Sequence, residues 1–283
     1  MIAGTKLRRS VLSWAVLSPV LVLALFPFAV MLSTALKPLP EVTAFPPRWL
    51  PSRLAFENFV DMWKTVDFGT GLANSILVSL SSTVLTILVS VPAAYAMSRL
   101  PFKGVGAYRQ FLLVTKMLSP ILLVLGLFRM AASIHIGDAT LVDTQIIVVV
   151  IYAAFNIAFA VWMLASYFGT IPVELEEAAW IDGASRARAV IRIFLPLSLP
   201  AIAVTGIVTF VGSWNEFVVA LTMLRDPARL TLPLKVVNLV AGRYQVEWNQ
   251  VMAATLLATL PVAIVFAALQ RYLVQGLTLG SVK

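Results

Sequence analysis

Six apolar stretches dominate the sequence, and each approaches the length that crosses a lipid bilayer. They run over residues 11–36, 72–97, 108–130, 145–167, 199–224 and 251–273. A helix needs about 20 consecutive apolar residues to cross the hydrocarbon core of a bilayer. The alternating segments of about ten residues that build a membrane β-barrel are not found in the sequence. We therefore expect an all-α polytopic membrane protein with six transmembrane helices, folded as one membrane domain over residues 1–283.

The composition agrees with a membrane location. Hydrophobic residues make up 60% of the chain and charged residues 12%, whereas a soluble domain is typically about half apolar and about one-quarter charged. The net charge of +8 does not indicate nucleic-acid binding, because the basic residues are scattered through short loops, as they are in membrane proteins. The lack of cysteine excludes disulfides and thiolate metal sites.

The first third of the chain contains two features that need an interpretation. The apolar stretch 11–36 follows basic residues, as in a secretory signal, but it is longer than the usual apolar core and lacks a clear A-x-A site. We therefore expect an uncleaved first span. Five prolines argue against a continuous helix over residues 37–71, and the aromatic residues of 54–63 predict a short interfacial helix there.

Residues 171–200 are the longest polar interruption in the second half of the chain. They read IPVELEEAAWIDGASRARAVIRIFLPLSLP. Pro172 can open a helix, because a first-turn residue has no hydrogen bond to lose. The glutamates of 174–177 suit the positive end of the helix dipole, and Gly183 can end the helix. The pattern predicts a short helix, a glycine turn and a second helix that leads into the fifth apolar stretch.

The spacing within this segment is specific. Residues 177–196 follow EAA-x3-G-x9-I-x-LP at every defined position. This spacing resembles the EAA signature of the transmembrane subunits of bacterial ABC importers. Residues 182–184, 195–197 and 270–283 resemble the carbohydrate-uptake branch, to which the inner-membrane subunits of maltose and glycerol-phosphate importers belong.

The resemblance implies a type I ABC importer permease fold in which this loop is the cytoplasmic coupling helix, docked in a groove of a separate ATPase subunit. The residues it assigns to ATPase coupling are Glu174, Glu177, Ala178, Ala179, Asp182, Gly183 and Ala184. Their chemistry agrees with such a contact, because small side chains admit a close partner surface and carboxylates suit a basic one. The alternative is an amphipathic linker that lies on the membrane surface.

Motifs for nucleotide binding and catalysis are missing from the sequence. No G-x-x-x-x-G-K-[ST] phosphate loop occurs, so we expect no cofactor in this chain, with ATP and Mg bound by the partner ATPase. No G-x-S-x-G or H-E-x-x-H motif occurs, and His135 is the only histidine. We therefore expect a transport subunit and not an enzyme.

Polar residues inside the apolar stretches are candidates for a translocation path, because an ionisable group in a membrane span is costly. The family often has a triplet similar to Trp214-Asn215-Glu216, which could face the path or its gate, or else fix helix packing. Lys116 could snorkel to the headgroups or pair with an acidic group such as Glu216 or one on a partner. Asn156 could line the path or hold two helices together.

The orientation follows from the short loops. Lys/Arg residues are almost equally divided between the two sides, but the short loop after the second stretch is strongly basic, and short loops and the first span weigh most. We expect a multi-pass protein of the bacterial cytoplasmic (inner) membrane, with cytoplasmic N- and C-termini. The tail at 274–283 would then lie on the ATPase side.

The resemblance implies a lipid membrane around the chain and three kinds of protein partner: a second homologous permease subunit, two ATPase subunits and an extracytoplasmic solute-binding protein. The implied function is import of a sugar, polyol or sugar derivative by alternating access. An ion-gradient-driven secondary transporter is the alternative, although its paired repeats of broken helices are not found. A membrane enzyme is a further alternative, but the catalytic set it needs is missing from the sequence.

Overall fold

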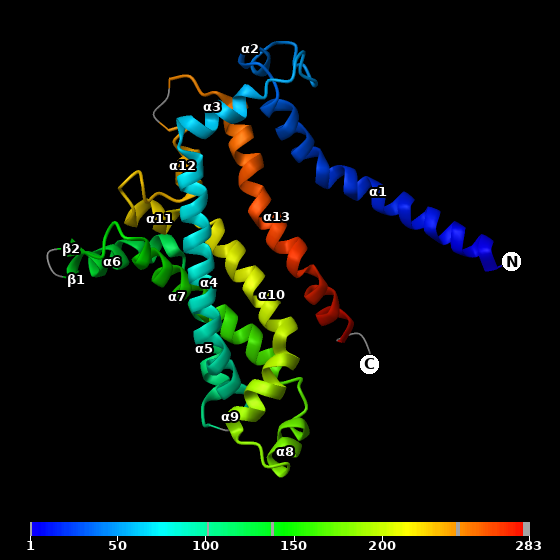
Figure 1. Ribbon diagram of the computed structural model, residues 1–283, viewed down its shortest axis with the longest axis vertical. Helices are drawn as coiled ribbons and strands as arrows, with labels where there is room; N and C mark the ends of the chain where they lie inside the picture. Colours follow the sequence, from blue (N-terminus) through cyan, green and yellow to red (C-terminus); the bar gives the residue numbers. More distant parts are fainter. Residues whose placement is uncertain (1, 101, 137–138, 242–243, 280–283) are drawn as a thin grey trace. The chain divides into compact units, whose positions relative to one another are not determined.

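The computed structural model describes residues 2–100, 102–136, 139–241 and 244–279 (Figure 1). Within these ranges five helical segments are long and apolar enough to cross a membrane. They contain α1 (Ile2–Ala35), α4 (Phe68–Arg99), α7 (Gln145–Phe168), α10 (Leu195–Trp214) and α13 (Trp248–Leu279). The predicted all-α class is confirmed, apart from one small hairpin of β1 (His135–Ile136) and β2 (Ala139–Thr140), which pair antiparallel.

The chain divides into two compact units. The first comprises residues 1–69 and 235–260, and the second comprises residues 70–234 and 261–283. The expected organisation as a single membrane domain stays a prediction.

The third apolar stretch, predicted as one span over 108–130, is sharply bent. It forms α5 (Val105–Thr115) and α6 (Pro120–Ser133), whose axes differ by 93°. Proline has no N–H to donate, and it disfavours the helical conformation in the residue before it. Ser119 is accordingly extended, with φ −68° and ψ 132°. The sixth membrane span exists only if this bent pair is counted as one.

The fifth stretch also differs from the prediction of one span over 199–224. Its helix starts earlier, because α9 (Arg186–Ala189) and a π-helical turn, η1 (Val190–Phe194), run directly into α10. It ends at Trp214, and a separate short helix, α11 (Val218–Met223), follows. The Trp214-Asn215-Glu216 triplet therefore lies at a helix end and not deep inside a span.

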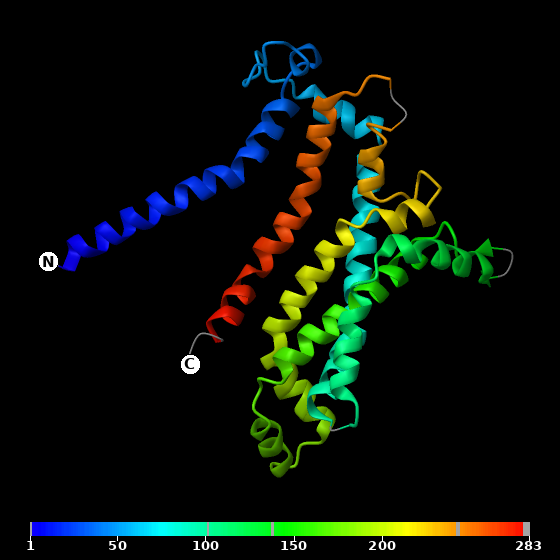
Figure 2. The same ribbon diagram turned by 180° about the vertical axis from the view of Figure 1, so that it is seen from behind.

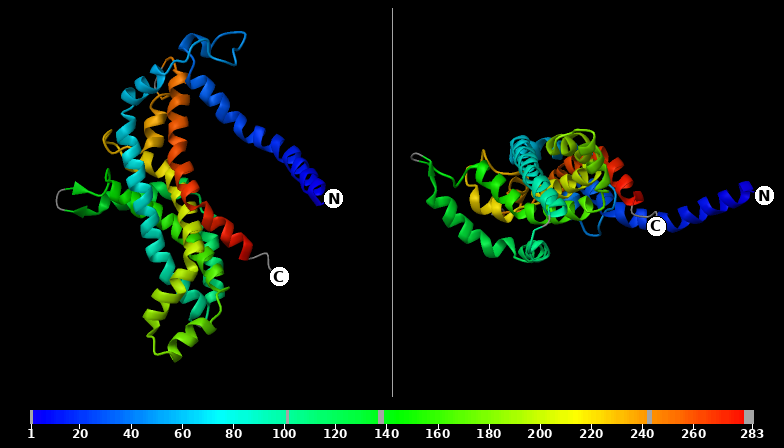
Figure 3. Two further views of the ribbon diagram at one scale, coloured as in Figure 1. Left: turned by 45° about the vertical axis from the view of Figure 1, so that its right-hand side comes forward. Right: turned by 90° about the horizontal axis from the view of Figure 1, so that it is seen from below.

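The second unit places the polar loop at one end of its long helices. α7 packs against both α10 and α5, and α11 packs against α6. Figures 2 and 3 show α8 (Glu174–Ile181) and α9 as a hairpin beyond the end of α10. Phe168, Phe194 and Leu164 lie at the centre of the core nearest this hairpin. A second core around Tyr152 and Met223 fills the region of α6, α7 and α11.

The first unit contains a short helix where one was predicted, and its interfacial position stays a prediction. α2 (Leu39–Val42) and α3 (Glu57–Thr65) follow α1, and α12 (Leu232–Val237) precedes α13. The buried Asn58 of α3 donates from Nδ2 to the carbonyl oxygens of Ala35 at 2.7 Å and Lys37 at 2.9 Å. Its Oδ1 accepts from Nδ2 of Asn249 at 2.8 Å. Asn58 thus fixes α3 to the end of α1 and to the start of α13.

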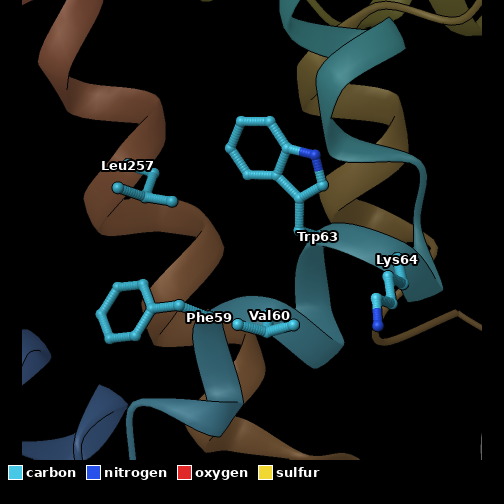
Figure 4. A pocket seen from close by; sticks show the side chains of 5 residues that line it. All are labelled: Phe59, Val60, Trp63, Lys64 and Leu257. Carbon is cyan, nitrogen blue, oxygen red and sulfur yellow. The ribbon is translucent and has the colours of Figure 1, made fainter.

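A hollow of about 270 Å³ lies between α3 and α13. Phe59, Val60, Trp63, Lys64 and Leu257 line it. Figure 4 shows Phe59 and Trp63 directed towards α13, with Lys64 directed away from it. The lining of this hollow is mainly apolar.

Candidate functional site

The glycine turn predicted after the short helix is present. At the end of α8 the N–H of Gly183 donates to the carbonyl oxygen of Trp180 at 3.0 Å, and the N–H of Ala184 donates to that of Ala179 at 2.9 Å. This pair of bonds is the Schellman motif, which needs a left-handed residue directly after the helix cap. Gly183 has φ +81°, and no atom lies within 4 Å of the position that a Cβ would occupy. Backbone conformation, not crowding, therefore requires glycine here.

Helix α8 has one buried face and one exposed face. Glu176 is 1% exposed and Ala179 is 7% exposed. Of the seven residues predicted for ATPase coupling, Ala179 is thus buried, Ala184 is partly exposed, and the others are exposed: Glu174, Glu177, Ala178, Asp182 and Gly183. The exposed face, defined here as Glu174, Glu177, Ala178, Ile181 and Asp182, is called the coupling face below.

The sequence pattern missed Ile181, whose side chain is 87% exposed. It lies four residues after Glu177 and seven after Glu174, so all three share one side of the helix. Ile181 therefore places an apolar group beside the carboxylates on the exposed side of α8. Helical spacing from Glu174 was the signal in the sequence that could have identified it.

The sequence pattern also missed Glu176 as a functional candidate. Its Oε1 lies 2.6 Å from Nε of Arg99, at the end of α4. Its Oε2 accepts a hydrogen bond from the hydroxyl of Tyr95 at 2.7 Å. Both partners lie about 80 positions earlier in the chain, so no local signal could reveal the pairing.

The two helices of the loop are joined by local contacts. Ser185 is the N-cap of α9, where its side chain accepts from the N–H of Arg188 at 3.4 Å. The guanidinium of Arg186 lies 5.4 Å from the ring centroid of Trp180 on α8. A cation over an indole face is attractive, so the contact of Arg186 with Trp180 holds α8 to α9, while Ser185 caps the start of α9.

The Trp214-Asn215-Glu216 triplet separates into three different environments. Trp214 is buried and stacks on Phe210, with ring centroids 5.7 Å apart. Glu216 is partly buried, and its carboxylate accepts from the N–H of Val219 at 3.0 and 3.1 Å, at the start of α11. Asn215 is exposed, and no hydrogen bond of its side chain was found among the described residues. The geometry thus gives Trp214 and Glu216 structural contacts, whereas the side chain of Asn215 lies exposed at the end of α10.

Asn156 belongs to a polar cluster that joins three long helices. Its Nδ2 donates to the carbonyl oxygen of Tyr152 at 2.9 Å and to Oγ of Ser213 on α10 at 3.2 Å. Ser213 in turn accepts from Oγ of Ser82 on α4 at 2.9 Å. Hydrogen bonds of this kind hold helices together in membranes, so these contacts favour the packing alternative for Asn156.

Lys116 lies at the break between α5 and α6, as the C-cap of α5. A cation is favourable at this end of a helix, because the unpaired carbonyl groups there carry partial negative charge. Its side chain is exposed, and neither a hydrogen bond nor an ion pair of its ammonium was found within the described part of the chain. The carboxylate of Glu216 instead accepts hydrogen bonds from N–H groups at the start of α11. The suggested pairing of Lys116 with Glu216 therefore has no support.

A second polar cluster lies just before the start of α7, around Asp143. Oδ1 of Asp143 accepts from the N–H of Arg225 at 2.8 Å and of Asp226 at 3.0 Å. Partial burial raises the pKa of this carboxyl, but these two hydrogen bonds and the cations of Arg229 and Arg225 outweigh it, so the pKa lies below its ordinary value of 3.8. The ionised side chain thus holds the loop that follows α11.

The described residues contain no group of three or more His, Asp or Glu side chains placed to hold a metal ion. The ion pairs and hydrogen bonds described above occupy the carboxylates of Glu176, Glu216 and Asp143 with protein partners.

Residues 68–279 match the family described as "Binding-protein-dependent transport system inner membrane component". The inner membrane ABC transporter permease protein YcjP of Escherichia coli is 35% identical over 93% of this chain and 92% of its own length. The sulfoquinovosyl glycerol transport system permease protein SmoH of Agrobacterium fabrum is 34% identical over 94% and 91%. The trehalose/maltose transport system permease protein MalG of Thermococcus litoralis is 34% identical over 93% and 92%.

The fold is also similar to solved structures. A chain of a bacterial ABC transporter involved in the import of the acidic polysaccharide alginate matches with a TM-score of 0.77, at 21% identity, over 95% of this chain and 97% of that one. A chain from the bacterial alginate ABC transporter in complex with an alginate pentasaccharide-bound periplasmic protein matches with a TM-score of 0.66, at 18% identity, over 94% of both. At these identities the similarity concerns the fold.

Proposed function

Because the chain belongs to the family of binding-protein-dependent transport system inner membrane components, we propose that it is the permease subunit of an ATP-driven ABC importer for a sugar, polyol or sugar derivative. Two relatives that align over nearly their whole length are named for sulfoquinovosyl glycerol and for trehalose and maltose. The observation that carries the proposal is the family match over 68–279, with the EAA loop folded as an exposed helical hairpin within it.

The proposed complex contains this chain, a second homologous permease, two ATPase subunits and an extracytoplasmic solute-binding protein. The solved neighbour that contains a periplasmic protein supports the last of these. ATP and Mg would be bound by the ATPase subunits. With the coupling face on the cytoplasmic side, both termini would lie there too, and the cluster around Asp143 would face the binding protein.

The coupling face has the chemistry that docking needs. Glu174, Glu177 and Asp182 supply negative charge for a basic groove, and Ile181, at the end of α8, supplies an apolar contact beside them. Buried apolar anchors surrounded by charged residues are typical of protein interfaces. Closure of the ATPase dimer would then move α8, and this motion would switch the path between its inward- and outward-facing states as a rigid-body shift.

The translocation path needs polar groups that are free to contact a hydroxylated substrate. Asn215 is the candidate in this chain, because its side chain is exposed. Trp214, Glu216 and Asn156 would support the path by holding the ends and faces of the helices around it. Lys116 would hold the bend between α5 and α6.

The proposal is tested with the complex reconstituted from the chain and its co-encoded partners. Glu177→Lys reverses a charge on the coupling face, and Gly183→Val disrupts the turn. Asp61→Lys on α3 and Gly126→Val on α6 are the matched controls, because both sites are exposed and lie outside the loop. Co-purification of the ATPase, ATP hydrolysis and sugar uptake are measured for each.

We expect the two loop variants to lose the ATPase or to abolish uptake, with both controls close to wild type. Unchanged uptake and hydrolysis in both loop variants would contradict the coupling role. Uptake that persists without any ATPase and follows an ion gradient would overturn the proposed function and favour a secondary transporter.

A further inference from the structure

The inner side of α8 carries a buried ion pair that the proposed docking does not use. Side-chain exposure is 8% for Arg99 and 2% for Glu176, and the atoms Nε and Oε1 are 2.6 Å apart. Nη2 of Arg99 also donates to the carbonyl oxygen of Ile171 at 2.8 Å. With the hydroxyl of Tyr95 on the other carboxylate oxygen at 2.7 Å, the charges of the pair are fully partnered.

An aromatic cluster encloses this pair. The guanidinium of Arg99 lies 5.2 Å from the ring centroid of Phe194. The rings of Tyr95 and Phe168 meet the same ring edge-on, at 4.9 and 4.8 Å between centroids. This cluster shields the ion pair from water, which strengthens the attraction between the charges. It also brings α4, α7, α8 and η1 to one point.

The pair connects α8 to a helix that is not its neighbour in the chain. Along the backbone, α8 continues into α7 on one side and into α9 and α10 on the other. Arg99 instead ends α4. The chain itself carries a displacement of α8 only to α7 and to α9 and α10, so the side-chain contacts of Glu176 with Arg99 and Tyr95 are what join α8 to α4.

Stability alone does not account for such a pair. Replacing a buried ion pair by apolar side chains of similar volume is often neutral or stabilising, because both charges must leave water. The charges and their hydrogen bonds fix the position of α8 relative to α4, because apolar side chains can slide past one another and a carboxylate held by two donors cannot.

We propose that Arg99 and Glu176 form a link that makes α4 move together with α8 during transport. The link rests on the proposed function, because it acts on the motion that ATP binding would give to α8. Both are positioning residues, which would act on the path through the helices that they join.

The first test compares sugar transported per ATP hydrolysed in the reconstituted complex. Glu176→Gln keeps the size of the side chain and removes its charge. We expect transport per ATP to fall about tenfold, within the range of typical coupling free energies, while hydrolysis continues. Glu57→Gln is the matched control, because it removes the charge from an ion pair with Arg53 that lies at the surface. The side chain of Arg53 is 64% exposed and that of Glu57 is 45% exposed.

A second variant separates a directional link from simple stabilisation. The double change Arg99→Met with Glu176→Leu replaces the ion pair by apolar side chains that the surrounding aromatic rings can accommodate. If the pair only stabilises the fold, this variant transports as wild type. We expect it to assemble with the ATPase but to remain uncoupled, like Glu176→Gln.

The motion itself can be measured, because the chain has no cysteine. Spin labels are placed at Val173→Cys, beside α8, and at Leu88→Cys on α4, which are 43% and 66% exposed. In the wild-type background we expect one narrow distance distribution, unchanged between nucleotide-free and ATP-bound complexes. In Glu176→Gln the distribution should broaden, or shift between the two states.

Each outcome decides between the explanations. If Glu176→Gln or the double variant transports as much sugar per ATP as wild type, the link is overturned. The link is also overturned if the distance distributions of Glu176→Gln match those of wild type in both nucleotide states. A wild-type complex that hydrolyses no ATP and imports no sugar would overturn the proposed function and the link with it. Coupled wild type with uncoupled variants supports both.

Discussion

The N–H of Ala184 donates to the carbonyl oxygen of Ala179 at 2.9 Å, and this bond closes the end of α8 across Gly183. It holds the coupling face in a fixed orientation relative to α9. The bond requires φ +81° at Gly183, a conformation that costs a residue with a Cβ about 1–2 kcal/mol.

The first prediction concerns this turn. Gly183→Ala should weaken the end of α8 by about 1–2 kcal/mol, without a clash, since the position of the added Cβ is open. Hydrogen exchange of the α8 amides should become roughly tenfold faster, because about 1.4 kcal/mol corresponds to a factor of ten. Gly126→Ala, in the middle of α6, is the control and should leave exchange in α8 unchanged. Equal exchange in the two variants would show that the turn does not depend on glycine.

The second prediction concerns Glu216 at the start of α11. Glu216→Ala removes the acceptor for the N–H groups of Val219 and Ala220, and loss of such a cap costs about 1 kcal/mol. Glu216→Gln keeps an acceptor and should lose less. We expect the unfolding temperature in detergent to be highest in wild type, lower in Glu216→Gln and lowest in Glu216→Ala. If transport is abolished in the Gln variant while stability is unchanged, Glu216 acts on the substrate and not as a cap.

The local elements of the polar loop could be predicted from the sequence because their signals are local. A proline, early glutamates and a glycine indicate a short helix and its end, and α8 forms between Pro172 and Gly183. The apolar stretches likewise predicted an all-α membrane fold, because hydrocarbon thickness sets their length.

The bends could not be predicted in this way. Pro120 breaks the third stretch, but Pro92, Pro200 and Pro261 lie inside continuous helices. Neighbouring helices and local adjustments can satisfy the backbone group that a proline frees, so tertiary packing decides which proline ends a helix.

The roles of individual polar residues were also beyond the sequence. Glu176 and Glu177 are adjacent glutamates in the same turn, yet one is buried against Arg99 and the other is exposed. Their roles depend on which face of α8 meets α4, and that depends on residues about 80 positions away. The coupling role of the exposed residues stays a prediction.

The third prediction concerns pH. The pKa of Asp143 lies below its ordinary value of 3.8 in the folded chain, because the hydrogen bonds from Arg225 and Asp226 and the nearby cations outweigh partial burial. A lowered folded pKa gives stability that is fully present above the unfolded value and is lost as pH falls through the folded value. Asp143→Asn should therefore lower the unfolding temperature at neutral pH, and the difference should shrink below about pH 3.8.

The control for this prediction is Asp61→Asn on α3. Its carboxylate is exposed, and no hydrogen bond of it was found in the part of the chain that the structure describes. We expect its unfolding temperature to follow wild type at every pH. If the unfolding temperatures of Asp143→Asn and wild type differ by the same amount from pH 7 to pH 3, the asparagine destabilises the loop for steric reasons and not because its charge is missing.

The last prediction separates the two asparagines considered for the path. Asn156→Ala removes the hydrogen bond to Ser213 between α7 and α10, and interhelical hydrogen bonds in membranes contribute about 0.6 kcal/mol on average. Asn215→Ala removes an exposed side chain with no such partner among the described residues. Asn156→Ala should therefore lower the unfolding temperature, and Asn215→Ala should leave it unchanged.

Sugar uptake by the reconstituted complex should show the opposite order. If Asn215 contacts the hydroxyl groups of the substrate, its loss should raise the sugar concentration that gives half-maximal uptake roughly two- to tenfold, because a lost hydrogen bond to a neutral partner is worth about 0.5–1.5 kcal/mol. Asn156→Ala should change this concentration little at temperatures well below its unfolding. Ser82→Ala, which removes the third member of the cluster, should behave like Asn156→Ala. If Asn156→Ala raises the sugar concentration for half-maximal uptake more than Asn215→Ala does, Asn156 on α7 and not Asn215 contacts the substrate.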